Sequence, residues 1–230
     1  MAIKVIKLKS IDSTSTYARK NALHLNLPAL IIADEQTCGR GRHGKTFLSP
    51  QGGLYMTLLF EADSAFDCIT PAAALCVMDA VKEFTGISLG IKWVNDLYLN
   101  EKKVCGILTE RFESGGRTLT AAGIGINLTT ESFPADLPKA GSIGADIPRE
   151  KLALSISEKL LAYNADFNKA EIRERYAANL FITGREVSFE INGVSHTGKA
   201  FGINGDFNLL VDCAGEIFTL SSGEISLKIR

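Results

Sequence analysis

The stretch Cys38–Gly53, CGRGRHGKTFLSPQGG, combines five glycines with closely spaced basic side chains. Glycine lets a backbone turn tightly and approach a ligand closely. The guanidinium groups of Arg40 and Arg42 can each donate two parallel hydrogen bonds to a phosphate or a carboxylate. The stretch lacks the spacing of a P-loop and the G-x-G-x-x-G pattern of a dinucleotide site. It therefore predicts either another kind of anion-binding loop or an ordinary solvated basic turn.

A second polar stretch is KWVNDLYLNEKKVCGIL. Its Asn95 and Asp96 are typical of a turn between two strands, and turn formation alone would explain them. Two lysines follow, and because successive strand residues face opposite sides, only one of them can point into a site. Of the two, Lys103 enters the next strand. Gly106 lies three positions later, where a missing side chain would let a ligand approach closely.

Two further stretches could offer polar contacts to a ligand. DSTST, at residues 12–16, supplies hydroxyl groups that could bind a ligand or could simply cap the helix that follows. GIGIN, at residues 123–127, places glycines inside an expected strand, which indicates a bulge or a nearby ligand. The amide of Asn127, at its end, could bind a base, a phosphate or a metal-bound water.

Several kinds of reactive centre are missing from the sequence. The three histidines are widely separated and have no metal-ligand spacing, and no pair of cysteines has the spacing of a zinc or redox motif. There is no G-x-S-x-G nucleophile motif and no paired cysteine and histidine for covalent catalysis. Any chemistry must therefore come from the polar and cationic stretches described above.

The elements that must position these residues alternate irregularly between strands and helices. Apolar patterns predict strands over 3–8, 29–34, 54–60, 89–94, 97–100, 104–112 and 118–128, and helices over about 15–23, 70–84, 148–167 and 170–180. Residues 129–147 are rich in polar residues, Pro and Gly, and are expected to form a loop. The hairpin around Asn100–Lys103 breaks a strict βαβ alternation. The pattern predicts an α+β or mixed α/β fold in which helices pack on a largely antiparallel sheet.

The pattern changes near Thr183–Gly184. Beyond this point the chain contains short strands separated by Asn-Gly and Ala-Gly turns. We therefore predict two domains, residues 1–183 with the polar stretches and residues 184–230 as a small β-barrel.

Composition narrows the class of protein. The 230 residues carry 25 Lys and Arg against 26 Asp and Glu, and 46% are hydrophobic, enough for a substantial core. This balance argues against a general DNA or membrane-surface binder. No apolar run approaches the roughly 20 residues that span a bilayer, and the N-terminus does not look like a signal peptide. Five scattered cysteines indicate reduced thiols and a cytoplasmic location.

Taken in order, the polar stretches resemble the biotin–protein ligases. The resemblance rests on DSTST, EQTCGRGRHGKTFLSPQGGLYMTLLF, KWVNDLYLNEKKVCGILTE, GIGINL and, near the end, GEISLK, and it extends over most of the chain. It implies a catalytic domain like that of class II aminoacyl-tRNA synthetases and biotin ligases, followed by an SH3-like barrel. It also implies a two-step reaction. Biotin and MgATP form biotinyl-5′-AMP and pyrophosphate, and the biotin then passes to one lysine of a biotin carboxyl carrier domain.

The resemblance also implies roles for individual residues. Biotin would be bound by Ser13, Thr14, Ser15, Gln36, Arg40, Gly41, Arg42, Lys103 and Gly106. ATP would be bound by Arg40, Arg42, Asn95 and Asn127. The residues expected to act in catalysis are Lys103, Arg40, Arg42 and Asp96. Asp96 would either hold Mg²⁺ or orient the incoming amine, and the sequence does not choose between these roles.

The chain departs from the family pattern at two of these stretches, and three other functions stay open. Ser15 stands where the family often has Asn, and Val94 stands where it often has Pro. A lipoate–protein ligase would share the fold and the adenylation chemistry, but it favours a different, more glycine-rich loop. A non-catalytic protein that binds biotin or a carrier domain would not need a phosphate clamp, and a nucleic-acid-binding barrel would need more basic residues after 184. We expect no N-terminal DNA-binding domain, and a homodimer stays open.

Overall fold

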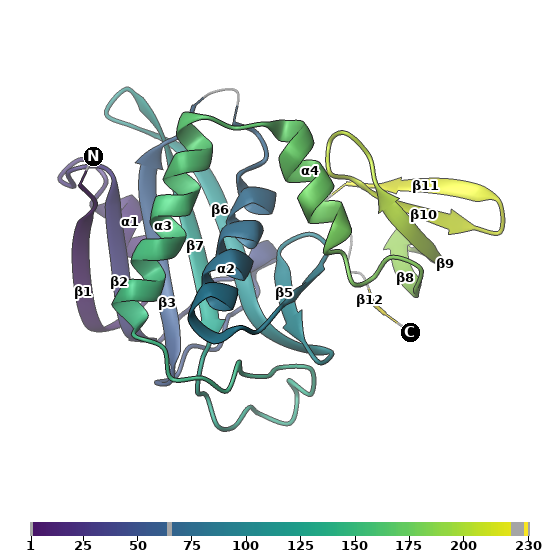
Figure 1. Cartoon of the computed structure of the whole chain (residues 1–230), viewed down its shortest axis with the longest axis horizontal. Helices are drawn as coiled ribbons and strands as arrows, with labels where there is room; N and C mark the ends of the chain where they lie inside the picture. The colour runs from purple at the N-terminus through teal and green to yellow at the C-terminus, as the bar shows by residue number, and fades with distance from the viewer. Residues whose placement is uncertain (1, 64–65, 222–227, 230) are drawn as a thin grey trace.

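The computed structural model describes residues 2–63, 66–221 and 228–229. Most of the GEISLK stretch therefore lies outside the described residues. The strands form two sheets (Figure 1). The large sheet has the order β1-β2-β3-β7-β6-β5-β4, with β1 Lys4–Ile11, β2 Ala29–Gln36, β3 Gly53–Glu61, β4 Gly90–Lys92, β5 Asp96–Leu99, β6 Lys102–Ser114 and β7 Arg117–Asn127. Of these strand pairs, β1 and β2 are parallel and the other five pairs are antiparallel, which confirms the largely antiparallel sheet.

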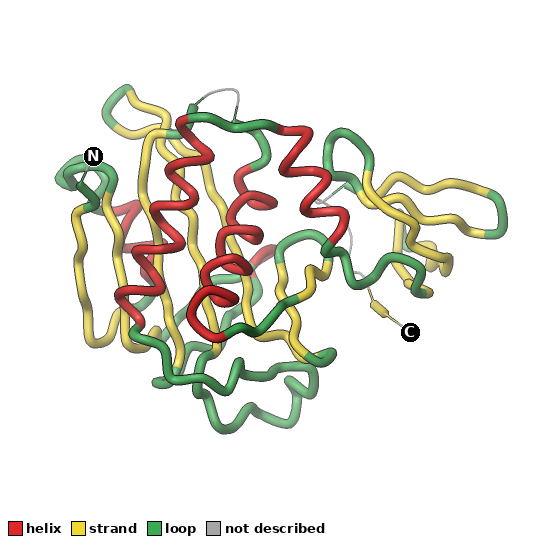
Figure 2. Tube along the Cα trace, in the orientation of Figure 1, coloured by secondary structure: helices red, strands yellow, loops and turns green. Residues whose placement is uncertain are grey.

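Helices cover both faces of this sheet. The long helices α2 (Ile69–Thr85) and α3 (Arg149–Ala165), with α4 (Lys169–Ala178), lie on one side of the strands (Figure 2). The short helix α1 (Thr14–Lys20) packs on the other side, against β2, β3 and β7. Alternation along β2 explains this arrangement, because Leu30 and Ile32 belong to the main core whereas Ile31 lies in the smaller core that contains Ala18 of α1. The predicted mixture of helices on a sheet is confirmed.

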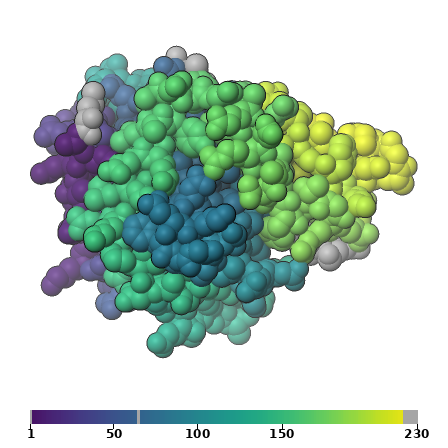
Figure 3. Space-filling model, in the orientation of Figure 1, coloured from purple at the N-terminus to yellow at the C-terminus, as the bar shows by residue number. Residues whose placement is uncertain are grey.

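The second sheet has the order β11-β10-β9-β8-β12, with β8 Glu186–Ile191, β9 Val194–Ile203, β10 Leu209–Cys213, β11 Glu216–Leu220 and β12 Lys228–Ile229. It forms one end of the molecule, beside the helical face (Figure 3). Its pairs are antiparallel, and no pairing of β11 with β12 that would close a barrel is found in the described part of the chain. The SH3-like barrel and the domain boundary at 183–184 thus stay predictions.

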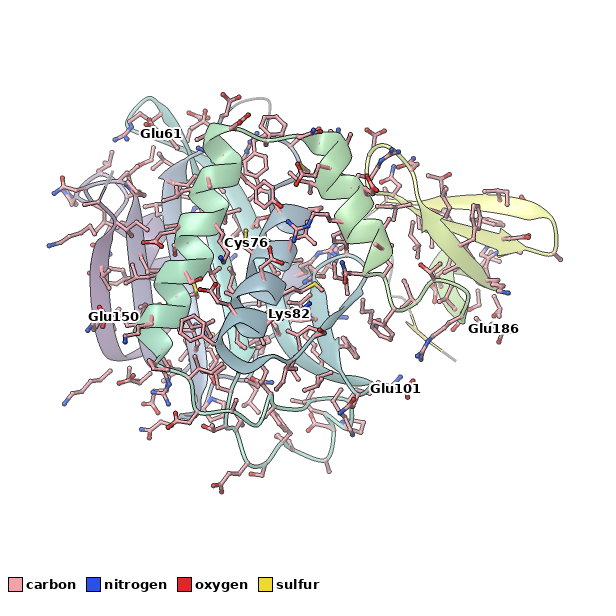
Figure 4. All side chains as sticks on the ribbon, in the orientation of Figure 1. Glu61, Cys76, Lys82, Glu101, Glu150 and Glu186 are labelled. Carbon is pink, nitrogen blue, oxygen red and sulfur yellow. The ribbon has the colours of Figure 1, made fainter. Side chains whose placement is uncertain are left out.

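The two sheets are joined by packing as well as by the chain. Phe207 and Leu209 of the C-terminal part belong to the same buried core as Trp93 and Tyr176. At the surface, Arg185 NH1 lies 2.6 Å from Glu101 Oε1, at the end of the β5–β6 hairpin nearest the second sheet (Figure 4).

Three other features bear on the sequence predictions. All five cysteines are unpaired, as expected for reduced thiols; of these, Cys76 is buried on α2 (Figure 4). Across the described residues, no helix has the length and apolar character needed to cross a membrane. No helix or strand interrupts residues 129–147, so the predicted loop is confirmed.

One local prediction is wrong. The strand expected over 89–94 ends at Lys92, and the following three residues form a turn from which Asp96 begins β5. The reason is tertiary. Tyr176 Oη donates a hydrogen bond of 2.8 Å to the carbonyl oxygen of Val94, and Trp93 Nε1 donates one of 2.8 Å to the carbonyl oxygen of Phe207. Residues more than 80 positions away therefore fix the backbone of this turn.

Candidate active site

A cavity of about 330 Å³ opens between the glycine-rich loop, the start of α1 and strands β4 to β7. It brings together side chains that are far apart in the sequence. One linked group of its lining residues, called here the hydroxyl end, carries the hydroxyl and amide groups of Ser13, Thr14, Ser15 and Gln36. A second group, called here the cationic end, consists of Arg42, Asn95, Asp96 and Lys103. Arg40, Gly41 and Gly106 also line the cavity. Apart from Asn127, every residue predicted to bind a ligand therefore lines this cavity.

The hydroxyl end is a connected hydrogen-bond network. Gln36 Oε1 accepts from the backbone N–H of Thr14 at 2.9 Å and from its hydroxyl at 3.1 Å. Thr57 Oγ1 donates to Thr14 Oγ1 at 2.9 Å and lies 3.1 Å from Ser15 Oγ. Because these groups are fixed by one another and nearly all buried, they can present both donors and acceptors to a neutral polar ligand.

Ser13 has two predicted roles, capping the helix that follows and binding a ligand. As the N-cap of α1, its side chain accepts a 3.4 Å hydrogen bond from the backbone N–H of Thr16. It is also buried and lines the cavity. The capping role is therefore confirmed, and the binding role stays a prediction.

The glycine-rich loop is folded back on itself. The N–H of Gly41 donates to the carbonyl oxygen of Lys45 at 2.7 Å, and the N–H of Phe47 donates to that of Gly39 at 2.8 Å. A side chain at Gly39 would lie 2.3 Å from the carbonyl oxygen of Phe47, so this turn requires glycine. The loop thus has a defined conformation that presents its arginines from one edge of the cavity.

The two arginines have different partners. Arg40 forms a bidentate ion pair with Glu110 near the surface, and both nitrogen–oxygen distances are 2.8 Å. Arg42 is half-buried and donates to Asn95 Oδ1 at 3.3 Å. Burial lowers the pKa of Arg42, and the nearby carboxylate of Asp96 opposes that effect. Arg42 is therefore the more buried of the two arginines, and an anionic ligand in the cavity could contact its guanidinium group.

Strand alternation sends the two lysines of β6 in opposite directions, as predicted. Lys103 lines the cavity, and its Nζ lies 2.7 Å from Asp96 Oδ1. Lys102 Nζ instead donates to the carbonyl oxygen of Pro138 at 2.5 Å. Asp96 Oδ1 is buried and, apart from this ion pair, receives no well-aligned hydrogen bond from the described residues. This oxygen is thus available to an incoming amine or cation.

The structure adds cavity residues that the sequence reasoning missed, namely Phe47, Lys45, Lys92 and Leu137. Lys92 pairs with Asp96 across β4 and β5, so both project from the same face of the sheet. Burial lowers the pKa of Lys92; Asp96 opposes this shift, while other lysines, including Lys103, add to it. The signal was present in the sequence, because two strands joined by a short turn place such residues opposite each other.

The ring of Phe47 explains two of the glycines. A Cβ atom at Gly106 would lie 2.9 Å from Phe47 Cε2, and one at Gly125 would lie 2.5 Å from Phe47 Cε1. Lys103 Nζ is 5.7 Å from the centre of the same ring, within the range of a cation–π interaction. In this structure the close approach expected at Gly106 is therefore made by an aromatic side chain of the glycine-rich loop.

Asn127 does not line the cavity. Its Nδ2 donates to the carbonyl oxygen of Gly141 at 2.9 Å, and its Oδ1 is buried without a hydrogen-bond partner among the described residues. It thereby ties the long loop after β7 to the sheet, and the same loop carries Leu137 to the cavity. Its predicted contact with the nucleotide stays a prediction.

The chain is similar in sequence to known protein ligases. Residues 8–128 match the Biotin/lipoate A/B protein ligase family. The Bifunctional ligase/repressor BirA of Bacillus spizizenii is 31% identical, over 94% of this chain and 72% of its own length. The Biotin–[acetyl-CoA-carboxylase] ligase of Paracoccus denitrificans is 39% identical, over 59% of this chain and 57% of its own.

A solved structure of the biotin protein ligase from Aquifex aeolicus, in complex with biotin and ATP, superposes with a TM-score of 0.83. The identity is 30%, and the match covers 99% of both chains. The structural match and the sequence matches agree, and the chain belongs to the Biotin/lipoate A/B protein ligase family.

Proposed function

We propose that this protein is a biotin–protein ligase. It would form biotinyl-5′-AMP from biotin and ATP and transfer the biotin to a lysine of a biotin carboxyl carrier domain. The observation that carries this proposal is that one cavity is lined both by a fixed network of hydroxyl and amide groups and by a cationic group. Biotin has the matching division, with a neutral polar ring at one end and a carboxylate at the other.

The cationic end suits the first step. A biotin carboxylate must attack the anionic α-phosphate of ATP, and the two groups repel each other. Arg42, Lys92 and Lys103 all line the cavity around Asp96, so positive charge lies where the two anions would meet. Preorganised cations in a water-poor site stabilise such a transition state and cost no reorganisation when the reaction occurs.

The described residues of the cavity could bind a magnesium ion that is already bound to ATP. They do not provide enough ligands to bind the ion without ATP. Within the described ranges, no group of three or more His, Cys, Asp and Glu side chains is placed to bind a metal. Asp96 Oδ1 is buried with spare acceptor capacity, and Mg²⁺ is commonly held by one or two carboxylates plus substrate phosphates. Bound in this way, the ion would neutralise charge on the phosphates.

The second step needs the adenylate to survive until the carrier arrives. The glycine-rich loop lies along one edge of the cavity and Leu137 comes from the loop after β7, so both could cover an adenylate and exclude water. Asp96 Oδ1 would then accept a hydrogen bond from the incoming lysine amine. This is the second role left open for Asp96 by the sequence.

The direct test is to mix the protein with biotin, MgATP and a biotin carboxyl carrier domain, and to measure the carrier by intact mass. We expect a mass increase of one biotin, dependent on ATP and abolished when the acceptor lysine is changed to arginine. Parallel reactions with lipoate and a lipoyl domain separate a lipoate ligase from a biotin ligase. Biotin binding without ATP turnover would instead indicate a non-catalytic binder.

A further inference from the structure

The turn Trp93–Asn95 contributes polar groups to the cavity, but the residues that fix its backbone do not line the cavity. Asn95 Oδ1 accepts from Arg42 NH1 at 3.3 Å, and the next residue is Asp96. Two hydrogen bonds to other parts of the chain fix the conformation of this turn. Tyr176 Oη on α4 donates to the carbonyl oxygen of Val94, and Trp93 Nε1 donates to the carbonyl oxygen of Phe207. The acceptor of the second bond, Phe207, lies in the loop between β9 and β10 of the C-terminal sheet.

The loop between β9 and β10 is shaped to make this contact. Phe207 has a φ of 59°, a left-handed conformation that is uncommon for a bulky residue. Asn204 organises the loop, because its Oδ1 accepts from the N–H of Asp206 at 2.9 Å and from that of Asn208 at 3.0 Å. A residue in such a conformation persists only where the surrounding structure fixes it, and such positions cluster at functional sites.

The contact is buried, and α4 packs against it. Trp93, Phe207 and Tyr176 are all buried, with exposed fractions of 6%, 7% and 0%. The rings of Tyr176 and Phe207 meet edge to face, with centroids 5.8 Å apart. At the rim, Lys169 Nζ lies 3.7 Å from Asp206 Oδ1, and Figure 1 shows this loop beside α4. Water cannot easily replace the two hydrogen bonds, so losing either would release the turn.

We propose that the β9–β10 loop is a positioning element of the active site: through Phe207 it holds the turn that sets Asn95, Arg42 and Asp96 in the cavity. The inference rests on the proposed function, since it assigns the C-terminal sheet a part in the adenylation step. The hydroxyl and amide groups that would bind the neutral ring of biotin come instead from α1, β2 and β3. The loop should therefore influence kcat and leave the KM for biotin nearly unchanged.

The test compares Asn204→Ala with Asn204→Asp, which keeps the accepting oxygen. The matched control is Asp212→Ala, because Asp212 Oδ1 accepts from the N–H of Gly215 at 2.7 Å in the β10–β11 turn of the same sheet. In biotin-dependent ATP–pyrophosphate exchange, we expect Asn204→Ala to lower kcat roughly three- to tenfold, as one or two lost hydrogen bonds would. Asn204→Asp and the control should stay within twofold of the wild type.

Fluorescence gives a readout of the contact itself, because Trp93 is the only tryptophan in the sequence. Its emission should shift to the red in Asn204→Ala and not in Asn204→Asp or the control. Wild-type kcat and an unshifted emission in folded Asn204→Ala would overturn the proposal. If the wild type shows no biotin-dependent exchange, the proposed function fails, while the emission shift still reports whether the loop holds the turn.

A second variant keeps the test sharp if Asn204→Ala does not fold. Tyr176→Phe removes only the hydroxyl that binds Val94 and leaves the ring packed against Phe207. Its control is Tyr163→Phe, whose hydroxyl accepts from Arg175 NH1 away from the turn. We expect a kcat several-fold lower for Tyr176→Phe alone, with the KM for biotin within twofold. Equal losses in both tyrosine variants would overturn the proposal.

Discussion

Replacing Lys103 with methionine removes one charge from the cationic end of the cavity and nearly preserves the shape of the side chain. Lys103 Nζ lies 2.7 Å from Asp96 Oδ1 and faces the space where the carboxylate and the α-phosphate would meet. A hydrogen bond to a charged group contributes about 1.5–3 kcal/mol. If that contact strengthens in the transition state, Lys103→Met should lower kcat/KM for adenylation roughly 10- to 150-fold.

The fold should survive this change. The side chains of Lys103 and Asp96 are 32% and 20% exposed, so their pair contributes no more than about 1 kcal/mol to the free energy of unfolding. Arg42 and Lys92 remain near Asp96 to offset its charge. Urea denaturation should therefore give a midpoint close to that of the wild type, which separates a catalytic loss from unfolding.

The assay is biotin-dependent ATP–pyrophosphate exchange, which reports the first step without a carrier. The matched control is Lys102→Met, since Lys102 precedes Lys103 and binds the carbonyl oxygen of Pro138 outside the cavity. We expect it to keep its exchange rate within about twofold. Normal exchange by folded Lys103→Met, or equal losses in the two variants, would refute the assignment of Lys103 to the reacting groups.

Three further predictions concern other parts of the cavity. A Cβ atom at Gly123 would lie 2.5 Å from Ser15 Oγ, so Gly123→Ala should lower the free energy of unfolding by about 1–3 kcal/mol and raise the KM for biotin; an unchanged urea midpoint would contradict this. Glu110→Gln should release Arg40 for a ligand phosphate and lower the KM for ATP in exchange assays, whereas a higher KM would show that the pair supports the loop. Burial lowers the pKa of Lys92, and bound ATP should raise it again. At a pH between that lowered pKa and the ordinary value of about 10.4, ATP binding should therefore be accompanied by proton uptake at Lys92. Calorimetry should detect this uptake as a binding heat that depends on the buffer, and the dependence should be lost in Lys92→Met.

Local pattern was sufficient for much of the fold. Period-two alternation identified the strands of the large sheet, and it also predicted that Lys102 and Lys103 would face opposite sides. It failed at Trp93 and Val94, where an apolar run continues but the backbone turns. The partners that hold this turn, Tyr176 and Phe207, are remote in sequence, so no local pattern could indicate them.

Most polar residues of the site were predictable from the sequence, although Lys45 and Lys92 were missed, and its apolar residues were less predictable. Charge and glycine spacing pointed to Arg42 and Gly106, and both line the cavity. Phe47 was missed because an aromatic residue in a loop has many uses, and only the folded loop places its ring over Gly106 and Gly125. The hydrogen bond from the Asn127 amide to the loop after β7 could not be predicted, because the sequence does not show how that loop is oriented.

The central claim is that this cavity joins a biotin carboxylate to the α-phosphate of ATP. The most direct measurement is to incubate the protein with biotin and MgATP labelled at the α-phosphate, without a carrier, and to analyse the protein-bound label and the released pyrophosphate. We predict one biotinyl adenylate bound per chain and one pyrophosphate released, with neither formed when biotin is omitted. Bound but intact ATP, with no labelled adenylate, would contradict it.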